Sequence, residues 1–295
     1  MSGDSLNTQP QPPAFYPAAM VNITNRCTLK CRHCFVFRDG NPIDRANEMD
    51  SASMLASLKG LQERHYIHTM LWMGGEPLLR PDVLREGIKL FKKNHITTNG
   101  TIDLPDLPGC IYVISIDGPP DINDAIRGKG VFARVMDTLS RVPDNFGSTV
   151  MCQCVVTKAN EDSLETLVEL LMPTRLEGVT FSFYVPNKTD AGDLTWKTLE
   201  RRDKAVYEAL RLKEKYPGFI WNSRRALELT LSTNAKAITD NCPAKQFVLP
   251  LYLEGDHFVR PFCCYGNDAD CDLCGAWVVF YLADKLGMGK QRNSG

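Results

Sequence analysis

Short apolar runs alternate with amphipathic stretches along residues 20–185, and most apolar runs end at a glycine or a polar residue. Apolar runs bounded by turn residues indicate buried strands, whereas apolar residues spaced three and four apart indicate helices. The pattern predicts strands at residues 20–23, 69–73, 96–98, 111–116, 149–156 and 179–185. It predicts helices between them at residues 51–65, 82–93, 131–141 and 164–171.

Strands that alternate with helices predict an α/β protein in which helices cover a parallel sheet. Six strands are too few for a closed eight-stranded barrel, which usually takes about 250 residues. We therefore expect a partial (β/α)6 TIM-type barrel. Functional residues in such folds lie at the carboxyl ends of the strands, where this chain carries its glycine-rich and polar segments.

The pattern changes after residue 185. A charged amphipathic helix is expected at residues 199–215 and another at 223–232, followed by apolar runs at 247–253 and 257–262. Glu254-Gly255-Asp256 joins these two runs, which predicts a hairpin with cysteines on both sides. We divide the chain into a disordered lead-in (1–17), a barrel core (18–190), a helical linker (191–235) and a small cysteine-rich hairpin extension (236–280).

Composition narrows the class of protein. The 295 residues include 34 Lys and Arg and 35 Asp and Glu, so the net charge is −1 and nothing suggests nucleic-acid binding. No apolar run reaches the roughly 20 residues of a transmembrane helix, and the polar N-terminus lacks a signal-peptide core, so we expect a cytoplasmic protein. Clustered cysteines in such a protein more often hold a metal than form disulfides.

Three of the eleven cysteines form the motif Cys27-x3-Cys31-x2-Cys34 directly after the first predicted strand. Three thiolates on one loop can hold three irons of a [4Fe–4S] cluster and leave the fourth iron open to a small molecule. Two alternatives remain at this point. His33 would complete a zinc site of irregular spacing, or the three cysteines are ordinary buried thiols.

The segment Cys27–Phe35 resembles the signature of the radical S-adenosylmethionine (SAM) superfamily. Further resemblances stand at the ends of the next three strands, in the family's order: Gly74-Gly75-Glu76-Pro77, Asn99-Gly100, and Ser115-Ile116-Asp117-Gly118 with Arg127-Gly128 downstream. The resemblance covers about residues 20–190. It implies a [4Fe–4S] cluster on Cys27, Cys31 and Cys34 that cleaves SAM reductively to a 5′-deoxyadenosyl radical, which abstracts hydrogen from a substrate or adds to it.

The resemblance also implies the SAM contacts. Gly74, Gly75 and Glu76 are expected near the amino group of SAM. Ser115 and Asp117 are expected to contact its ribose and methionine parts, and Asn99 is expected as a further contact to SAM. Arg127 would pair with the SAM carboxylate, and Phe35 would lie near the adenine. Turn formation or helix capping would explain several of these residues equally well.

A second group of cysteines surrounds the predicted hairpin: Cys242, Cys263, Cys264, Cys271 and Cys274. This segment resembles the SPASM and twitch extensions, and also the cysteine-bearing tail of hopanoid-type radical SAM enzymes. The resemblance implies an auxiliary [4Fe–4S] cluster on Cys242, Cys263 or Cys264, Cys271 and Cys274. A zinc site and free thiols are the alternatives, and Cys110, Cys152 and Cys154 are interpreted as core residues.

Two functions therefore compete at the level of sequence. The first is a radical SAM enzyme that acts on a small molecule, lipid or peptide and takes electrons from a donor such as flavodoxin or ferredoxin. The second is a non-catalytic iron–sulfur or zinc-binding protein. The polar strand ends favour the enzyme, because an electron carrier has no need of a nucleotide-like pocket.

Overall fold

Eight strands form a single sheet in the computed structural model, which describes residues 15–41 and 43–289. Their order across the sheet is β6-β5-β4-β3-β2-β1-β7-β8. The strands are β1 (Ala18–Asn22), β2 (Thr69–Met73), β3 (Lys93–Thr98), β4 (Ile111–Ser115), β5 (Thr149–Val156), β6 (Val179–Phe183), β7 (Val248–Glu254) and β8 (His257–Val259). Neighbours are parallel except for β8, which runs antiparallel to β7.

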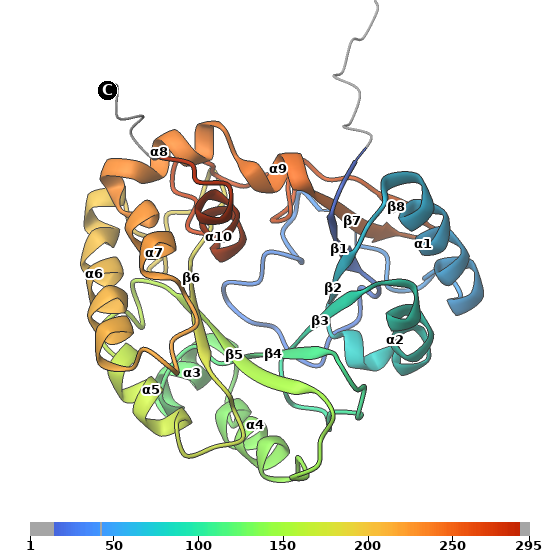
Figure 1. The fold of residues 1–295 in the computed structure, drawn as a ribbon, viewed down its shortest axis with the longest axis horizontal. Helices are drawn as coiled ribbons and strands as arrows, with labels where there is room; N and C mark the ends of the chain where they lie inside the picture. The colour runs from blue at the N-terminus through green and yellow to red at the C-terminus, as the bar shows by residue number, and fades with distance from the viewer. Residues whose placement is uncertain (1–14, 42, 290–295) are drawn as a thin grey trace, which may run out of the picture.

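Helices surround the curved sheet on its outer side (Figure 1). The α-helices are α1 (Ser51–His65), α2 (Pro81–Gly87), α3 (Pro120–Arg127), α4 (Val131–Ser140), α5 (Leu164–Leu171), α6 (Leu199–Lys215), α7 (Arg224–Thr230), α8 (Ser232–Asp240), α9 (Pro243–Phe247) and α10 (Trp277–Lys285). Two 3-10 helices, η1 (Pro77–Leu79) and η2 (Ile88–Leu90), flank α2. None of the helices in the described ranges is long and apolar enough to span a bilayer.

The sheet does not close, because β6 and β8 are its two edges. The segment before α10 runs beside β6, where the Phe183 amide donates a hydrogen bond to the Gly275 carbonyl (2.8 Å). The predicted partial barrel is confirmed, and its open side lies between β6 and β7 (Figure 1).

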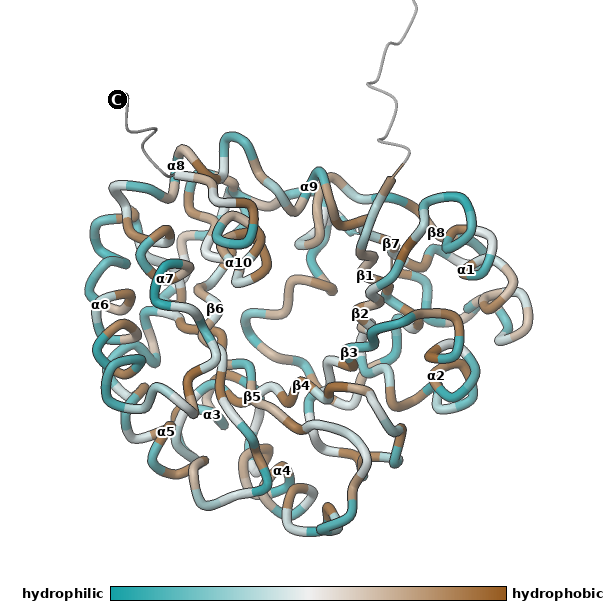
Figure 2. Tube along the Cα trace, viewed as in Figure 1, coloured by the Kyte–Doolittle hydropathy of each residue, from teal (hydrophilic) through white to brown (hydrophobic). Residues whose placement is uncertain are grey.

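Burial of the strands on both faces explains their apolar sequences. All five residues of β6 are buried, as a sheet covered by helices requires. Apolar positions follow β5 and β6, whereas the outer helix α6 is largely hydrophilic (Figure 2). Cys110, Cys152 and Cys154 are at most 2% exposed and belong to this core, as predicted.

Two helical predictions need correction. The helix expected at 82–93 ends at Gly87 and continues only as the short η2, because Lys93 must already pair with Thr69 of β2. The helix expected at 223–232 breaks at Leu231, whose extended backbone separates α7 from α8. The sequence analysis did not predict α3, α8, α9 or α10.

The hairpin and the lead-in also differ from expectation. Strand β7 pairs with β1 in parallel, with Leu249 opposite Ala19, so the hairpin extends the main sheet and is no separate appendage. This pairing buries six of the seven residues of β7. Tyr16, which we assigned to the disordered lead-in, is fully buried, and residues 1–14 of that lead-in lie outside the described residues.

Candidate functional site

Cys27, Cys31 and Cys34 lie on the loop that leaves β1 at the carboxyl edge of the sheet. All three are partly exposed and border a cavity of about 380 Å³ inside the barrel. The loop is fixed against α3 by a hydrogen bond from the Arg32 amide to the Ile126 carbonyl (2.9 Å). Burial raises the pKa of the Cys31 thiol to about 11, although Arg127 acts in the opposite direction.

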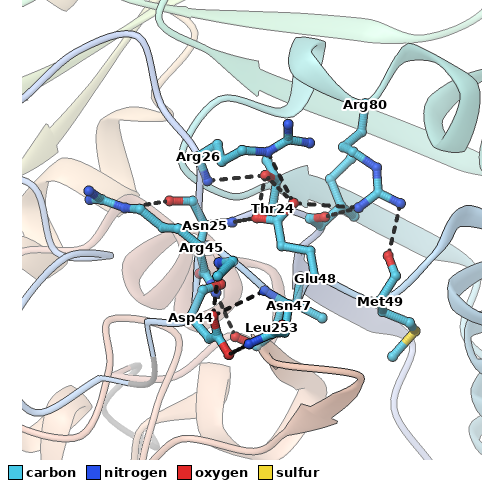
Figure 3. A network of polar contacts seen from close by, with 12 residues as sticks. Thr24, Asn25, Arg26, Asp44, Arg45, Asn47, Glu48, Met49, Arg80 and Leu253 are labelled. Atoms are coloured by element: carbon cyan, nitrogen blue, oxygen red, sulfur yellow. Dashed lines mark hydrogen bonds and ion pairs between the residues drawn. The ribbon is translucent and has the colours of Figure 1, made fainter.

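A polar network holds the chain just before Cys27 (Figure 3). The carboxylate of Glu48 accepts hydrogen bonds from the Thr24 hydroxyl (2.7 Å), the Asn25 amide (2.6 Å) and the Arg26 guanidinium (3.2 Å). The Arg80 guanidinium lies 3.7 Å away and extends the network to the start of α2. Glu48 therefore fixes the entry to the cysteine loop.

Gly74 and Gly75 let the end of β2 approach this same entry. Gly74 has a φ of +148°, and a Cβ there would lie 2.7 Å from the Thr24 carbonyl oxygen. A Cβ on Gly75 would overlap the Arg26 carbonyl. The Gly75 amide donates to the Thr24 carbonyl (2.7 Å), so the two glycines join β2 to the cysteine loop as well as bordering the cavity.

Glu76 does not border the cavity. Its carboxylate is fully buried and accepts hydrogen bonds from the Leu78 amide (3.1 Å), the Thr98 hydroxyl (2.7 Å) and the Asn99 amide (2.9 Å). Burial raises the pKa of this carboxyl, although the three donors act in the opposite direction. Glu76 caps η1 and positions Asn99, so any influence on a bound ligand passes through other residues.

Asp117 is fully buried between His33 and the cationic Arg127. Its Oδ2 lies 2.7 Å from His33 Nε2 and 2.6 Å from Arg127 Nε, and its Oδ1 accepts a hydrogen bond from the Val155 amide (2.8 Å). Burial alone would raise the pKa of Asp117, but Arg127 and His33 together hold it well below its ordinary range. His33 Nε2 thus contacts Asp117. No three potential ligands within the described ranges converge on one metal ion, so the zinc alternative for the first cysteine motif has no support.

The predicted SAM contacts separate into two groups. Those that border the cavity beside the cysteines are Phe35, Gly74, Gly75, Asn99, Ser115 and Arg127. Glu76 and Asp117 do not border the cavity. Glu76 holds Asn99 by a hydrogen bond, and Asp117 holds Arg127 by an ion pair. Arg127 Nη1 lies 3.9 Å from Cys31 Sγ, so a cation faces the cysteine loop from the cavity wall.

The C-terminal cysteines gather around a second, smaller cavity. Cys242, Cys263, Cys264, Cys271 and Cys274 all border it, and Lys245 Nζ lies 3.7 Å from Cys271 Sγ. Cys264 also borders the barrel cavity, whereas Cys263 does not. The hairpin and α9 thus bring together all five cysteines that the sequence singled out.

The cysteines of each group border a common cavity. Within residues 15–41 and 43–289, no three His, Cys, Asp or Glu side chains converge closely enough to ligate one metal ion.

Comparison with known proteins decides the family. The model of the Radical SAM superfamily matches residues 21–171, just over half of the chain. The chain belongs to the radical SAM superfamily. A [4Fe–4S] cluster and SAM are the cofactors of that family, so the predicted cofactor class is confirmed at family level.

Curated relatives of this radical SAM protein are enzymes with different products. This chain is 27% identical over 252 residues to Fe-coproporphyrin III synthase of Methanosarcina barkeri. The alignment covers 82% of this chain and 57% of that protein. It is 32% identical over 187 residues to pre-heme d1 synthase of Dinoroseobacter shibae, covering 60% of this chain and 44% of that protein. The chain thus spans about half the length of these relatives.

Solved structures share the fold. Streptococcus suis SuiB bound to its precursor peptide SuiA matches 95% of this chain and 69% of its own with a TM-score of 0.62 at 14% identity. Native anSMEcpe with bound AdoMet matches 74% of this chain and 67% of its own with a TM-score of 0.57 at 17% identity. At these identities the likeness shows the fold alone.

The sequence analysis missed Glu48 and the role of His33. Glu48 stands in a polar loop without a motif, and only the folded chain brings it against Thr24 and Asn25. His33 was considered only as a zinc ligand, because its partner Asp117 is 84 residues away.

Proposed function

We propose that this radical SAM protein is an enzyme that cleaves SAM reductively and uses the resulting radical on a substrate in the barrel cavity. The observation that carries the proposal is the shared cavity: three cysteines of one loop and six of the predicted SAM contacts border the same space. A non-catalytic iron–sulfur protein would not require that arrangement.

Cys27, Cys31 and Cys34 would hold the catalytic cluster. When bound there, a [4Fe–4S] cluster with one open iron supplies the electron that cleaves SAM to methionine and a 5′-deoxyadenosyl radical. Arg127 would pair with the SAM carboxylate, held in place by Asp117 behind it. The backbone of Gly74 and Gly75 with Asn99 and Ser115 would orient the rest of SAM, and the Phe35 ring would face the adenine.

The barrel interior would hold the substrate and keep water from the radical. The cavity is lined mainly by apolar side chains, including Ile111, Met151 and Trp277. One relative is named for the synthesis of Fe-coproporphyrin III, and one solved structure of the same fold is bound to a precursor peptide, so these proteins do not select one substrate for this chain. We assign the substrate class as a small molecule, lipid or peptide.

Electrons would come from a reduced flavodoxin or ferredoxin in the cytoplasm. An open cleft is bordered by Cys31 and Cys34, by four basic side chains and by Asp190 and Asp193, of which Asp193 pairs with Arg32 (2.6 Å). The excess of basic side chains there would attract an acidic donor. None of the eleven cysteines, all of which lie within the described ranges, forms a disulfide, which suits a reducing compartment.

The C-terminal cysteines would hold the auxiliary [4Fe–4S] cluster. Five cysteines border one cavity there, and this cavity and the barrel cavity share Cys264 and Tyr265 as a wall. A cluster behind that wall would lie next to the barrel cavity and could exchange electrons with a group bound there.

The test is SAM cleavage by anaerobically reconstituted protein. With a strong chemical reductant, the wild-type chain should form 5′-deoxyadenosine, and the variant with Cys27, Cys31 and Cys34 all changed to Ala should form none. The Cys110→Ala variant serves as the control, because Cys110 is a core thiol. Formation of 5′-deoxyadenosine by the triple variant would refute the proposal.

A further inference from the structure

Arg202 of α6 is an arginine buried to 1% exposure behind the C-terminal cysteines. Its Nη1 donates hydrogen bonds to the carbonyls of Cys274 (2.9 Å) and Leu273 (3.3 Å), and its Nη2 donates to the Thr230 carbonyl (2.6 Å). Its guanidinium carbon lies 5.9 Å from the centre of the Phe183 ring. These contacts fix the guanidinium against the chain on either side of Cys274.

The charge of Arg202 has no acidic partner in the part of the chain that the structure describes. No carboxylate there lies within ion-pair distance of the guanidinium, and both oxygens of the neighbouring Asp203 accept hydrogen bonds from Ser232. Carbonyl groups accept from Nη1 and Nη2 but leave the buried Nε without a partner and do not neutralise the charge. Because a buried unpaired charge is strongly destabilising, a negative group beside Arg202 would stabilise the protein.

Apart from Asp203, which is held by Ser232, the group near Arg202 that can carry a negative charge is the thiol of Cys274, whose own carbonyl accepts the Arg202 hydrogen bond. A second cation, Lys245, contacts the same group of cysteines: its Nζ lies 3.7 Å from Cys271 Sγ and 3.4 Å from the centre of the Phe262 ring. The charged side chains that border this cavity are Lys245, Arg260 and Asp270, and together with Arg202 behind Cys274 they leave an excess of two cations. Neutral thiols would leave this excess without a counter-charge.

Four thiolates around a [4Fe–4S] core carry a net charge of about −2, which matches two cations. We propose that Arg202 and Lys245 are the counter-charges of the auxiliary cluster and raise its reduction potential. This inference rests on the auxiliary cluster of the proposed function. It also favours metal-bound thiolates over free thiols at this site, on grounds of charge alone.

The experiment uses the full chain with Cys27, Cys31 and Cys34 changed to Ala, so that only the C-terminal cluster contributes. Lys245→Gln is the principal variant, because Lys245 is only half-buried and its loss should not prevent folding. We expect this variant to keep its iron and to shift the one-electron equilibrium at least tenfold towards the oxidised cluster. A tenfold change corresponds to a midpoint potential lower by about 59 mV, measured by an EPR-monitored redox titration.

Arg202→Met removes the buried cation at similar length, and Arg202→Lys retains it. The Met variant should lose at least half of its iron or show the same downward shift, while the Lys variant should keep both iron and potential close to the parent values. Arg201→Gln is the matched control, since Arg201 is the exposed neighbour on α6. Its cluster should be unchanged.

Unchanged potentials in Lys245→Gln together with unchanged iron and potential in Arg202→Met would overturn the proposal. Zinc, or no metal at all, in the parent triple variant would overturn it as well. Neither result affects formation of 5′-deoxyadenosine by the wild-type chain, so failure here is distinguishable from failure of the proposed SAM chemistry.

Discussion

Arg127 contributes both to the cavity wall and to the stability of the protein. Its guanidinium borders the cavity and pairs with buried Asp117 at 2.6 Å. The side chain is therefore held rigidly in place before any ligand arrives, and a rigid guanidinium loses little freedom when it binds a carboxylate.

Arg127→Ala should weaken SAM binding about tenfold or more, because a lost charge-assisted hydrogen bond costs roughly 1.5–3 kcal/mol. Binding of SAM to the reconstituted protein gives the measurement, with iron content as a check that the cluster is present. Arg134→Ala, an exposed arginine on α4, should bind SAM normally. Unchanged affinity in Arg127→Ala would remove Arg127 from the SAM site.

Asp117 can be tested through stability, since it is the counter-ion of Arg127 and His33. Asp117→Asn leaves Arg127 buried without its carboxylate and should lower the free energy of unfolding by about 3–5 kcal/mol at neutral pH. The folded-state pKa of Asp117 is lowered, so its stabilisation is complete above the ordinary Asp pKa of about 3.9 and is lost as the pH falls towards the lowered value. The difference between wild type and Asp117→Asn should therefore shrink in acid.

Urea unfolding from pH 7 to pH 3 measures this difference. The matched control is Asp121→Asn, an exposed aspartate in the first turn of α3. A difference that is constant with pH would show that the paired charge of Asp117 contributes nothing to stability.

At the scale of elements, the cysteine loop depends on its neighbours more than on its own sequence. Glu48 binds Thr24, Asn25 and Arg26 from a separate loop (Figure 3). Asn25 also donates a hydrogen bond to the Leu253 carbonyl of β7 (2.9 Å). The loop is thus fixed between α1 and the C-terminal hairpin.

Glu48→Ala should loosen this loop, because it removes three hydrogen bonds to one carboxylate. We expect the free energy of unfolding to fall by about 3 kcal/mol and the iron bound at the first site to fall with it. Iron per chain and urea unfolding are the measurements, and Glu63→Ala on the exposed face of α1 is the control. Full iron content in Glu48→Ala would mean that the cysteines order the loop without this network.

The sequence predicts the local structure of single strands and helices well. Strands β2 and β5 and helices α1, α5 and α6 have the predicted bounds, because their apolar periodicity and their terminal residues agree. The site motifs were also found, since each follows a strand within a few residues. Contacts between distant segments were not found: Asp117 with His33, Glu48 with Thr24, and β7 with β1 all depend on the fold.

On the scale of the whole molecule, the C-terminal segment completes the barrel that the N-terminal segment begins. Strand β7 continues the sheet beyond β1, while the chain between Cys271 and α10 runs back to β6. The second cysteine group therefore lies against the open side of the barrel. A cluster held by these cysteines would share the wall of Cys264 and Tyr265 with the barrel cavity, and a site unrelated to that cavity would not need this position.

Two clusters predict about eight irons per chain after anaerobic reconstitution. The variant without Cys27, Cys31 and Cys34 should keep about half of that iron and remain brown, because the C-terminal thiols lie around a separate cavity. Iron and zinc analysis of both proteins measures this. A colourless variant with zinc would replace the auxiliary cluster with a structural zinc site, and one without metal would leave free thiols.

Single changes of the adjacent cysteines refine this iron count. Cys263 and Cys264 lie at a tight turn closed by the hydrogen bond from the Gly266 amide to the Cys263 carbonyl (3.0 Å), and Cys264 borders both cavities whereas Cys263 borders only the C-terminal one. In the background that lacks Cys27, Cys31 and Cys34, Cys263→Ala and Cys264→Ala should therefore differ in the iron they retain. If Cys263→Ala loses the cluster, Cys263 is a ligand and Cys264 remains on the wall that the two cavities share. If Cys264→Ala loses it, Cys264 is a ligand, and Cys263 does not border the barrel cavity. Equal retention by the two variants would contradict a specific role for either cysteine.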